Sequence, residues 1–151
     1  MQEIQTIREI AHGSAAYWGT VALRDAVLRQ PLGLRFSAEE LAAEADSCHL
    51  ACYRGDRLAA CLVLRPLADG DVQMRQVAVA PDWQRQGIGT ALAERSEALA
   101  RARGFRRMVL HARESAVPFY ERLGYSRIGE RFEEVTLPHW AMEKRLAPAN
   151  Q

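Results

Sequence analysis

The sequence predicts a single α/β domain over residues 1–151, in which helices flank a mixed sheet. The length of 151 residues suits one domain with one hydrophobic core. The hydrophobic pattern changes period, from strand-like runs in the middle of the chain to a helical spacing over residues 87–103. Turn signals then separate further strand-like runs towards the C-terminus. This alternation of strands and helices is typical of an α/β protein.

The N-terminal third predicts a short strand over residues 4–9 and then two helices. Ser14 can cap a helix that runs to about Gln30, where a following proline and glycine can end it. Ser37 and Glu40 form an S-x-x-E capping box for a second helix.

The middle of the chain predicts three strands, over residues 48–53, 58–66 and 72–80. The first two are joined by Arg54-Gly55-Asp56-Arg57, which is a hairpin signal. A long helix over residues 87–103 follows, with its apolar residues on one face and a glycine at its C-terminal end.

The C-terminal third predicts one strand, one short helix and two closing strands. The first strand covers residues 107–112, and Ser115 is expected to cap the short helix, which Gly124 ends. The closing strands are expected over residues 125–132 and 139–146.

Composition argues against several classes of protein. The 20 basic and 19 acidic residues give a net charge of +1, which provides no strong field for nucleic acid or an anionic membrane. Cys48, Cys52 and Cys61 are odd in number and lack a CxxC pair, so neither a disulfide scaffold nor a zinc site is expected. Residues 2–10 do not form a signal peptide, and no apolar run approaches the roughly 18 residues of a membrane span. We therefore expect a cytoplasmic enzyme.

The most informative segment joins the strand ending near residue 80 to the helix that begins near residue 87. A glycine-bearing turn at a helix N-terminus presents free backbone N–H groups and the positive end of the helix dipole. Such a junction suits a phosphate group, and glycines at residues 87 and 89 let the ligand approach the amides.

Two common phosphate-binding motifs do not fit this turn. A Walker A loop needs Gly-Lys followed by Ser or Thr, and the segment contains no lysine. A dinucleotide fingerprint needs a third glycine, where the chain has Leu92, and an acidic residue near the end of the next strand, where it has Leu110 and His111.

The residues around the turn resemble the GNAT N-acetyltransferase superfamily. Gln84-Arg85-Gln86-Gly87-Ile88-Gly89 matches the Gln/Arg-x-x-Gly-x-Gly/Ala motif of that family. The flanking residues 75–81 and 87–103 resemble its fourth strand and third helix. The segment from Ala116 to Tyr125 is similar to the Ala-x-x-Phe-Tyr-x-x-x-Gly-Phe/Tyr signature of its fourth helix. The resemblance extends over roughly residues 48–146.

The resemblance implies the GNAT fold, a mostly antiparallel central sheet with splayed fourth and fifth strands and about four flanking helices. It also implies acetyl-CoA as a cosubstrate. The pantetheine amides would pair with the backbones of Val77 and Val79, as in strand addition. The pyrophosphate would bind backbone amides of the turn, which belong to Arg85, Gln86, Gly87, Ile88, Gly89 and Thr90.

The family mechanism is direct attack of an amine on the thioester carbonyl. By resemblance, Tyr120 would protonate the departing thiolate, because this leaving group becomes basic as the C–S bond breaks. His111 or His139 could accept the ammonium proton, since imidazole titrates near neutrality. We prefer His139, because the last strand usually lines the acceptor side in this family. Each histidine could instead have only a structural role, and no metal is expected.

Two features depart from the family pattern. Many members carry asparagine where this chain has Arg113, whose side chain could bind a CoA phosphate or point into solvent. The fourth strand contains no carboxylate and instead carries Gln73, Arg75 and Gln76, so a general base on that strand is not expected.

The acceptor is expected to be a small-molecule or peptide amine, and a homodimer is possible. Specificity should reside around Tyr17, Trp18, Arg24 and Arg29, and around residues 134–140. Glu133 and Glu134 form a solvated face or hold a cationic substrate. The alternatives are transfer of another acyl group and a domain that binds acyl-CoA without turnover.

Overall fold

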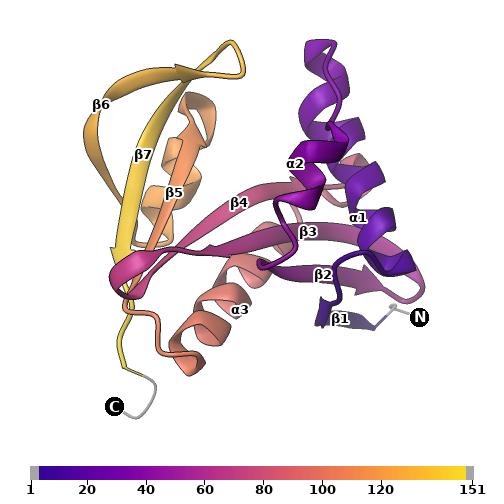
Figure 1. Ribbon diagram of the computed structural model, residues 1–151, viewed down its shortest axis with the longest axis horizontal. Coiled ribbons are helices and arrows are strands. Elements are labelled where there is room, and N and C mark those ends of the chain that lie inside the picture. Colours follow the sequence, from indigo (N-terminus) through magenta and orange to yellow (C-terminus); the bar gives the residue numbers. More distant parts are fainter. Residues whose placement is uncertain (1–3, 149–151) are drawn as a thin grey trace.

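The computed structural model describes residues 4–148, so residues 1–3 and 149–151 of the predicted domain, including Gln2, lie outside the described range (Figure 1). A seven-stranded sheet has the order β1-β2-β3-β4-β5-β7-β6. The strands are β1 (Gln5–Ile10), β2 (Cys48–Arg54), β3 (Arg57–Pro66), β4 (Asp71–Val79), β5 (Arg107–Arg113), β6 (Ser126–Glu134) and β7 (Leu137–Arg145). The predicted strands are therefore all present, with ends that differ by one or two residues.

Every neighbouring pair of strands is antiparallel except β4 and β5, which are parallel. Parallel neighbours need a crossover connection, and α3 (Ile88–Ala102) provides it. The mixed, mostly antiparallel sheet that the sequence predicts is confirmed.

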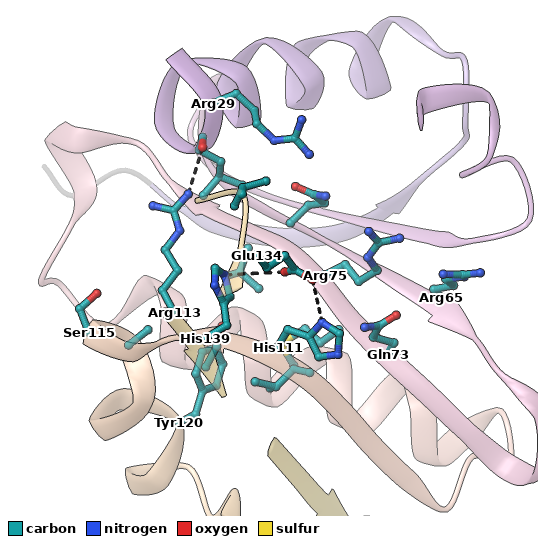
Figure 2. A pocket seen from close by; sticks show the side chains of 18 residues that line it. Arg29, Arg65, Gln73, Arg75, His111, Arg113, Ser115, Tyr120, Glu134 and His139 are labelled. Carbon is teal, nitrogen blue, oxygen red and sulfur yellow. Dashed lines mark hydrogen bonds and ion pairs between the residues drawn. The ribbon is translucent and has the colours of Figure 1, made fainter. Parts of the chain in front are cut away.

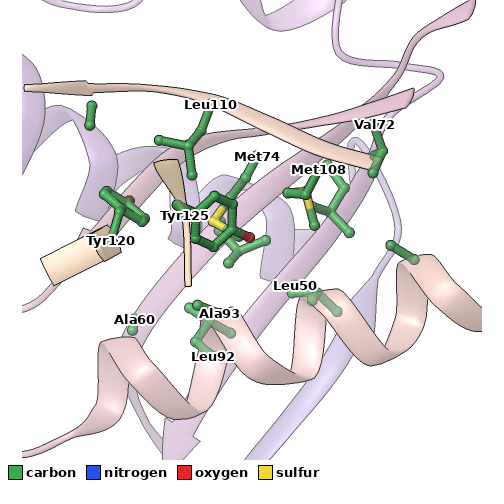
Figure 3. Packing of buried hydrophobic residues seen from close by; sticks show 14 of the residues in the cluster. Leu50, Ala60, Val72, Met74, Leu92, Ala93, Met108, Leu110, Tyr120 and Tyr125 are labelled. Carbon is green, nitrogen blue, oxygen red and sulfur yellow. The ribbon is translucent and has the colours of Figure 1, made fainter. Parts of the chain in front are cut away.

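Helices cover both faces of the sheet (Figure 1). α1 (Ala15–Arg24) and α2 (Ala38–Ala42) pack on one face, with a small apolar cluster that contains Tyr17 and Leu41. α3 and α4 (Val117–Arg122) pack on the other face, over the main core. Figure 3 shows this core, in which the labelled side chains of β4 and β5 face those of α3. None of the helices in the described range has the length and apolarity needed to span a bilayer.

The predicted helix starts at the N-terminal side are confirmed. The Ser14 side chain accepts a hydrogen bond from the Tyr17 amide at 3.1 Å. The Ser37–Glu40 capping box is complete, with each side chain bonded to the other residue's backbone N–H. Each pair satisfies amides that the first helical turn would otherwise leave without a partner.

Two local predictions were wrong. The α-helix that starts after Ser14 ends at Arg24, and the chain continues as a π-helical segment over Asp25–Arg29 and a 3-10 turn. Ser115 does not cap α4, because it lies inside a 3-10 turn, and the helix begins at Val117 without a side-chain cap. Proline in the first turn of α4 fixes the backbone angle there and makes a cap less necessary.

The sheet opens between β4 and β5, as the resemblance implied. Their pairing covers only Asp71–Met74 against Arg107–Leu110. Beyond it, the β3–β4 register shifts and Gln76 adopts a positive φ of 55°, which marks a bulge in β4. The bulge turns the end of β4 away from β5 and leaves one edge of β4 unpaired with that strand.

Candidate functional site

The opening between β4 and β5 leads into a cleft of about 480 Å³, which we call the splay cleft (Figure 2). The strands β3, β4, β5, the β6–β7 hairpin, the end of the α1 region and α4 all contribute to it. The splay cleft is lined by Leu28, Arg29, Arg65, Gln73, Met74, Arg75, Gln76, Val77, Leu110, His111, Ala112, Arg113, Ser115, Ala116, Tyr120, Glu134, Val135 and His139.

Tyr120 on α4 lines the splay cleft. Its ring packs edge-on against Phe119 and Tyr125, at centroid distances of 5.0 and 5.8 Å. The hydroxyl forms no hydrogen bond with any residue in the range 4–148. Burial raises the pKa of Tyr120 to about 12, so the phenol carries its proton at neutral pH. This is the state that a general acid needs.

His111, His139 and Glu134 come together in the splay cleft (Figure 2). The Nδ1 atom of His111 lies 3.0 Å from one Glu134 carboxylate oxygen, and Nε2 of His139 lies 3.7 Å from the other. The Nδ1–H of His139 donates to the Leu137 carbonyl at 2.9 Å, because a carbonyl can only accept. In neutral His139, Nε2 therefore carries the lone pair and is able to accept a proton.

A strained turn holds Glu134 over the splay cleft. Glu134 and Leu137 are paired at the end of the β6–β7 hairpin, and only Val135 and Thr136 connect them. Both have positive φ, 44° and 66°, as a two-residue turn of this hand requires. Glycine and asparagine favour this conformation, and β-branched residues rarely adopt it. Backbone strain of this kind is common beside functional sites.

The turn before α3 has the free amides that a phosphate site needs. Within the described residues, no backbone N–H of residues 85–90 donates to a protein acceptor. Arg85 and Gly87 have positive φ, 63° and 81°. Side chains hold the turn in place, because the Gln84 amide donates to the Val79 carbonyl and the Gln86 amide to the Asp82 carbonyl, each at 3.0 Å.

The two glycines of the turn are not equivalent. A Cβ at Gly87 would meet no protein atom within 4 Å, so it would enter the open space in front of the free amides. A Cβ at Gly89 would instead lie 3.5 Å from Phe119 and 3.8 Å from Val79. A large side chain at Gly89 would therefore press on Phe119, which packs against Tyr120. The sequence analysis expected both glycines to let a ligand approach the amides, and the open space fits this reason only at Gly87.

The C-terminal part of β4 is not paired with β5. The Ala80 amide donates to the Ala59 carbonyl of β3 at 2.8 Å. Since backbone groups alternate along a strand, those of Val77 and Val79 face the opposite edge, towards the opening. The side chain of Gln84 already uses one lone pair of the Val79 carbonyl.

Among the residues predicted from the sequence, Val77, Tyr120 and His139 all line the splay cleft. Val79, the last residue of β4, and residues 85–90, which follow that strand, lie outside the lining of the cleft. Arg113 lines the cleft and donates to the Leu28 carbonyl at 3.0 Å. Its side chain therefore does not point into solvent, and one of its N–H groups is already bonded within the protein.

The predicted specificity residues near α1 divide into two groups. Arg24 is 0% exposed and pairs with Glu44 at 2.6 Å, and the hydroxyl of buried Tyr17 donates to the same carboxylate at 2.8 Å. Burial opposes the charge of Glu44, yet the hydrogen bonds from Arg24 hold its pKa below the ordinary value. Through Glu44, Arg24 and Tyr17 anchor α1 to the segment after α2. Arg29 lines the splay cleft, and Trp18 is exposed.

Sequence reasoning missed two contributors. Arg65 was not singled out, and Arg75 was noted only because it is not a carboxylate. The alternation of side chains along the predicted strands over residues 58–66 and 72–80 could have placed both on one face of the sheet. The joint position of His111, Glu134 and His139 required the β5–β7 pairing, which the sequence does not reveal.

The profile described as the Acetyltransferase (GNAT) family matches residues 11–125. The chain belongs to this family. The GNAT assignment accounts for the splayed sheet, the glycine turn and the tyrosine on α4 as parts of one arrangement.

Several relatives agree with the GNAT assignment. The chain is 28% identical over 102 residues to the uncharacterized N-acetyltransferase YjcF of Bacillus subtilis, covering 67% of this chain and 72% of that protein. Its fold matches a protein of Lactobacillus plantarum assigned as an N-acetyltransferase, with a TM-score of 0.85, 25% identity and coverage of 95% and 99% of the two chains. It also matches the fold of an aminoglycoside 6′-N-acetyltransferase complexed with coenzyme A, with a TM-score of 0.77, 18% identity and coverage of 97% and 99%.

Proposed function

We propose that the protein transfers the acetyl group of acetyl-CoA to an amine by direct attack, with Tyr120 as the general acid. One observation carries this proposal. The Tyr120 hydroxyl has no hydrogen-bond partner within the described residues, and Tyr120 lines the same splay cleft as the end of β4 that is not paired with β5. The Tyr120 oxygen is not among the buried polar atoms that lack a partner in the described residues, so this hydroxyl stays accessible to a ligand in the cleft.

The donor site is built mainly from backbone groups. The amides of Val77 and Val79 would pair with the pantetheine arm, which would then lie beside β4 like an added strand. The free amides of residues 85–90 and the positive end of α3 would hold the pyrophosphate. Both contacts are compatible with the positions of these groups, since neither set is fully used within the protein.

The proton transfers can be assigned to two side chains. His139 would accept a proton from the acceptor ammonium through Nε2, and Glu134 would then stabilise the resulting imidazolium. The neutral amine would attack the thioester carbonyl carbon. As the C–S bond breaks, Tyr120 would donate its proton to the sulfur, and the phenolate would recover a proton from solvent.

A thiol-release assay with acetyl-CoA and a panel of amines tests the proposed function. We expect release that depends on the amine, together with the mass of the acetylated amine among the products. A rate higher with a longer acyl-CoA would assign the domain to another acyl group. Tight binding of acetyl-CoA with only slow, amine-independent hydrolysis would identify a binding module and contradict the proposal.

Replacement of His139 by glutamine should lower kcat/KM at neutral pH by about 10² to 10⁴-fold, the range for a positioned general base. His111→Gln is the matched variant, because His111 contacts the same Glu134 carboxylate from a more exposed position. The pH profile should be measured with two amines of different basicity. A histidine base should make kcat/KM rise with pH, with a midpoint that is the same for both amines. If the midpoint of this rise instead shifts with the pKa of the amine, and both variants keep the rise, the acceptor loses its proton to water and neither histidine is the base.

A further inference from the structure

Two arginine side chains in the splay cleft have no partner. Arg65 and Arg75 line the cleft, and neither forms an ion pair or side-chain hydrogen bond with any residue in the described part of the chain. The other two arginines of the lining are engaged, since Arg29 pairs with Glu40 at 2.9 Å and Arg113 donates to the Leu28 carbonyl.

The strand register brings Arg65 and Arg75 onto one wall of the cleft. Arg65 on β3 pairs directly with Gln73 on β4, so these side chains share one face of the sheet. Arg75 lies two residues beyond Gln73 and therefore points to the same side. In Figure 2, Arg65 and Arg75 follow one another along the β3–β4 side of the cleft.

Positive charge predominates in the lining of the cleft. Four arginines line it, and Glu134 is the only carboxylate among the lining residues. Glu134 on β6 lies beside His111 and His139, whereas Arg65 and Arg75 lie on β3 and β4. A cation would therefore be favoured beside Glu134 and an anion beside Arg65 and Arg75.

We propose that the acceptor is an amine that also carries a carboxylate, of the amino-acid type. Its ammonium group would lie beside Glu134 and His139, and its carboxylate would bind Arg65 and Arg75. The arginine fork matches the two oxygens of a carboxylate. This assignment rests on the proposed N-acetyltransferase function and adds the acceptor class to it.

The arginines are placed for the acceptor and not for the donor. The free amides before α3 already offer a site for the pyrophosphate, and residues 85–90 are not part of the cleft lining. Arg65 lies on β3, and β4 separates this strand from the opening along which the donor would enter. If the arginines instead bound a phosphate of CoA, their loss would weaken acetyl-CoA binding.

The experiment compares acceptors that differ only in the anionic group. β-Alanine and β-alaninamide are acetylated by wild type and by Arg65→Gln, Arg75→Gln and Arg95→Gln. Arg95 is an exposed residue of α3 outside the cleft and serves as the matched control. For each variant, kcat/KM for β-alanine is divided by kcat/KM for β-alaninamide. Comparing this ratio between variants removes the effect of the different basicity of the two amines. A third acceptor, 2-aminoethyl phosphate, distinguishes a carboxylate site from a phosphate site.

We expect Arg75→Gln to lower kcat/KM for β-alanine by about 10- to 100-fold, the range for a hydrogen bond to a charged group. Activity with β-alaninamide and the KM for acetyl-CoA should stay unchanged, and Arg95→Gln should resemble wild type. Equal loss for both acceptors, no loss, a higher KM for acetyl-CoA, or a preference for the phosphate would each overturn the assignment.

A binding measurement separates failure of this inference from failure of the proposed function. N-acetyl-β-alanine should raise the unfolding temperature of wild type, and N-acetyl-β-alaninamide should not. If no amine is acetylated, but N-acetyl-β-alanine stabilises wild type and not Arg75→Gln, the anion site stands and the transferase function fails. If amines are acetylated without any carboxylate preference or stabilisation, the function stands and the anion site is wrong.

Discussion

Replacement of Tyr120 by phenylalanine is expected to lower kcat by about 10²-fold, the lower end of the range for a positioned general acid. The hydroxyl would act on the leaving thiolate in the transition state, so its loss should affect kcat and leave acetyl-CoA affinity close to that of wild type. The hydroxyl makes no hydrogen bond within the described residues, so stability should also change little. Steady-state kinetics, calorimetry with acetyl-CoA and thermal unfolding measure the three quantities.

Tyr125→Phe provides the opposite pattern as a control. The Tyr125 hydroxyl donates to the buried Glu97 carboxylate at 2.8 Å, and Lys144 donates to the other oxygen of that group. Removing the hydroxyl should cost about 1 to 3 kcal/mol of stability, because a buried carboxylate oxygen loses its donor. Its kcat should remain near wild type. An unchanged kcat in Tyr120→Phe, with chemistry shown to be rate-limiting, would assign protonation of the sulfur to water or another group.

Replacement of Gly87 by alanine should weaken acetyl-CoA binding at least about 10-fold, the change that 1.4 kcal/mol produces. The added Cβ would enter the open space in front of the free amides, where the pyrophosphate is proposed to bind. The measurement is the dissociation constant of acetyl-CoA by calorimetry.

The positive φ of Gly87 also makes any side chain there unfavourable, by about 1 to 2 kcal/mol. Gly104→Ala controls for this cost, because Gly104 follows the other end of α3, has a φ of 87° and likewise has no atom within 4 Å of an added Cβ. Both variants should lose similar stability, and only Gly87→Ala should lose affinity. Wild-type affinity in Gly87→Ala would place the pyrophosphate elsewhere.

Most of the fold could be predicted from the sequence because its signals are local. Periodicity located α3 and the strands, and the Ser37–Glu40 pair located α2. Ser115 misled because a serine before a helix is a frequent cap, whereas here a 3-10 turn intervenes. The π-helical segment after Arg24 has no simple sequence signal, since it depends on how the helix end packs against the sheet.

The residues of the candidate site likewise include some that have a local sequence signal and some that do not. Tyr120 and the glycine turn lie in motifs that are continuous in sequence, so they could be found directly. Arg24 lies in a region that was expected to set specificity, but its pairing with Glu44 joins residues twenty positions apart and depends on tertiary packing. Glu134, His111 and Arg65 come from three different strands, and only the order of strands in the sheet brings them to one cleft.

The opening between β4 and β5 has a consequence for how this enzyme can diversify. On the proposed donor side, the groups that would contact the ligand belong to the main chain, which mutation leaves in place so long as the local backbone keeps its course. On the acceptor side, the groups are side chains, and each is replaced by a single codon change. The chain can therefore exchange one acceptor for another at positions such as Arg65 and Arg75 without rebuilding donor binding.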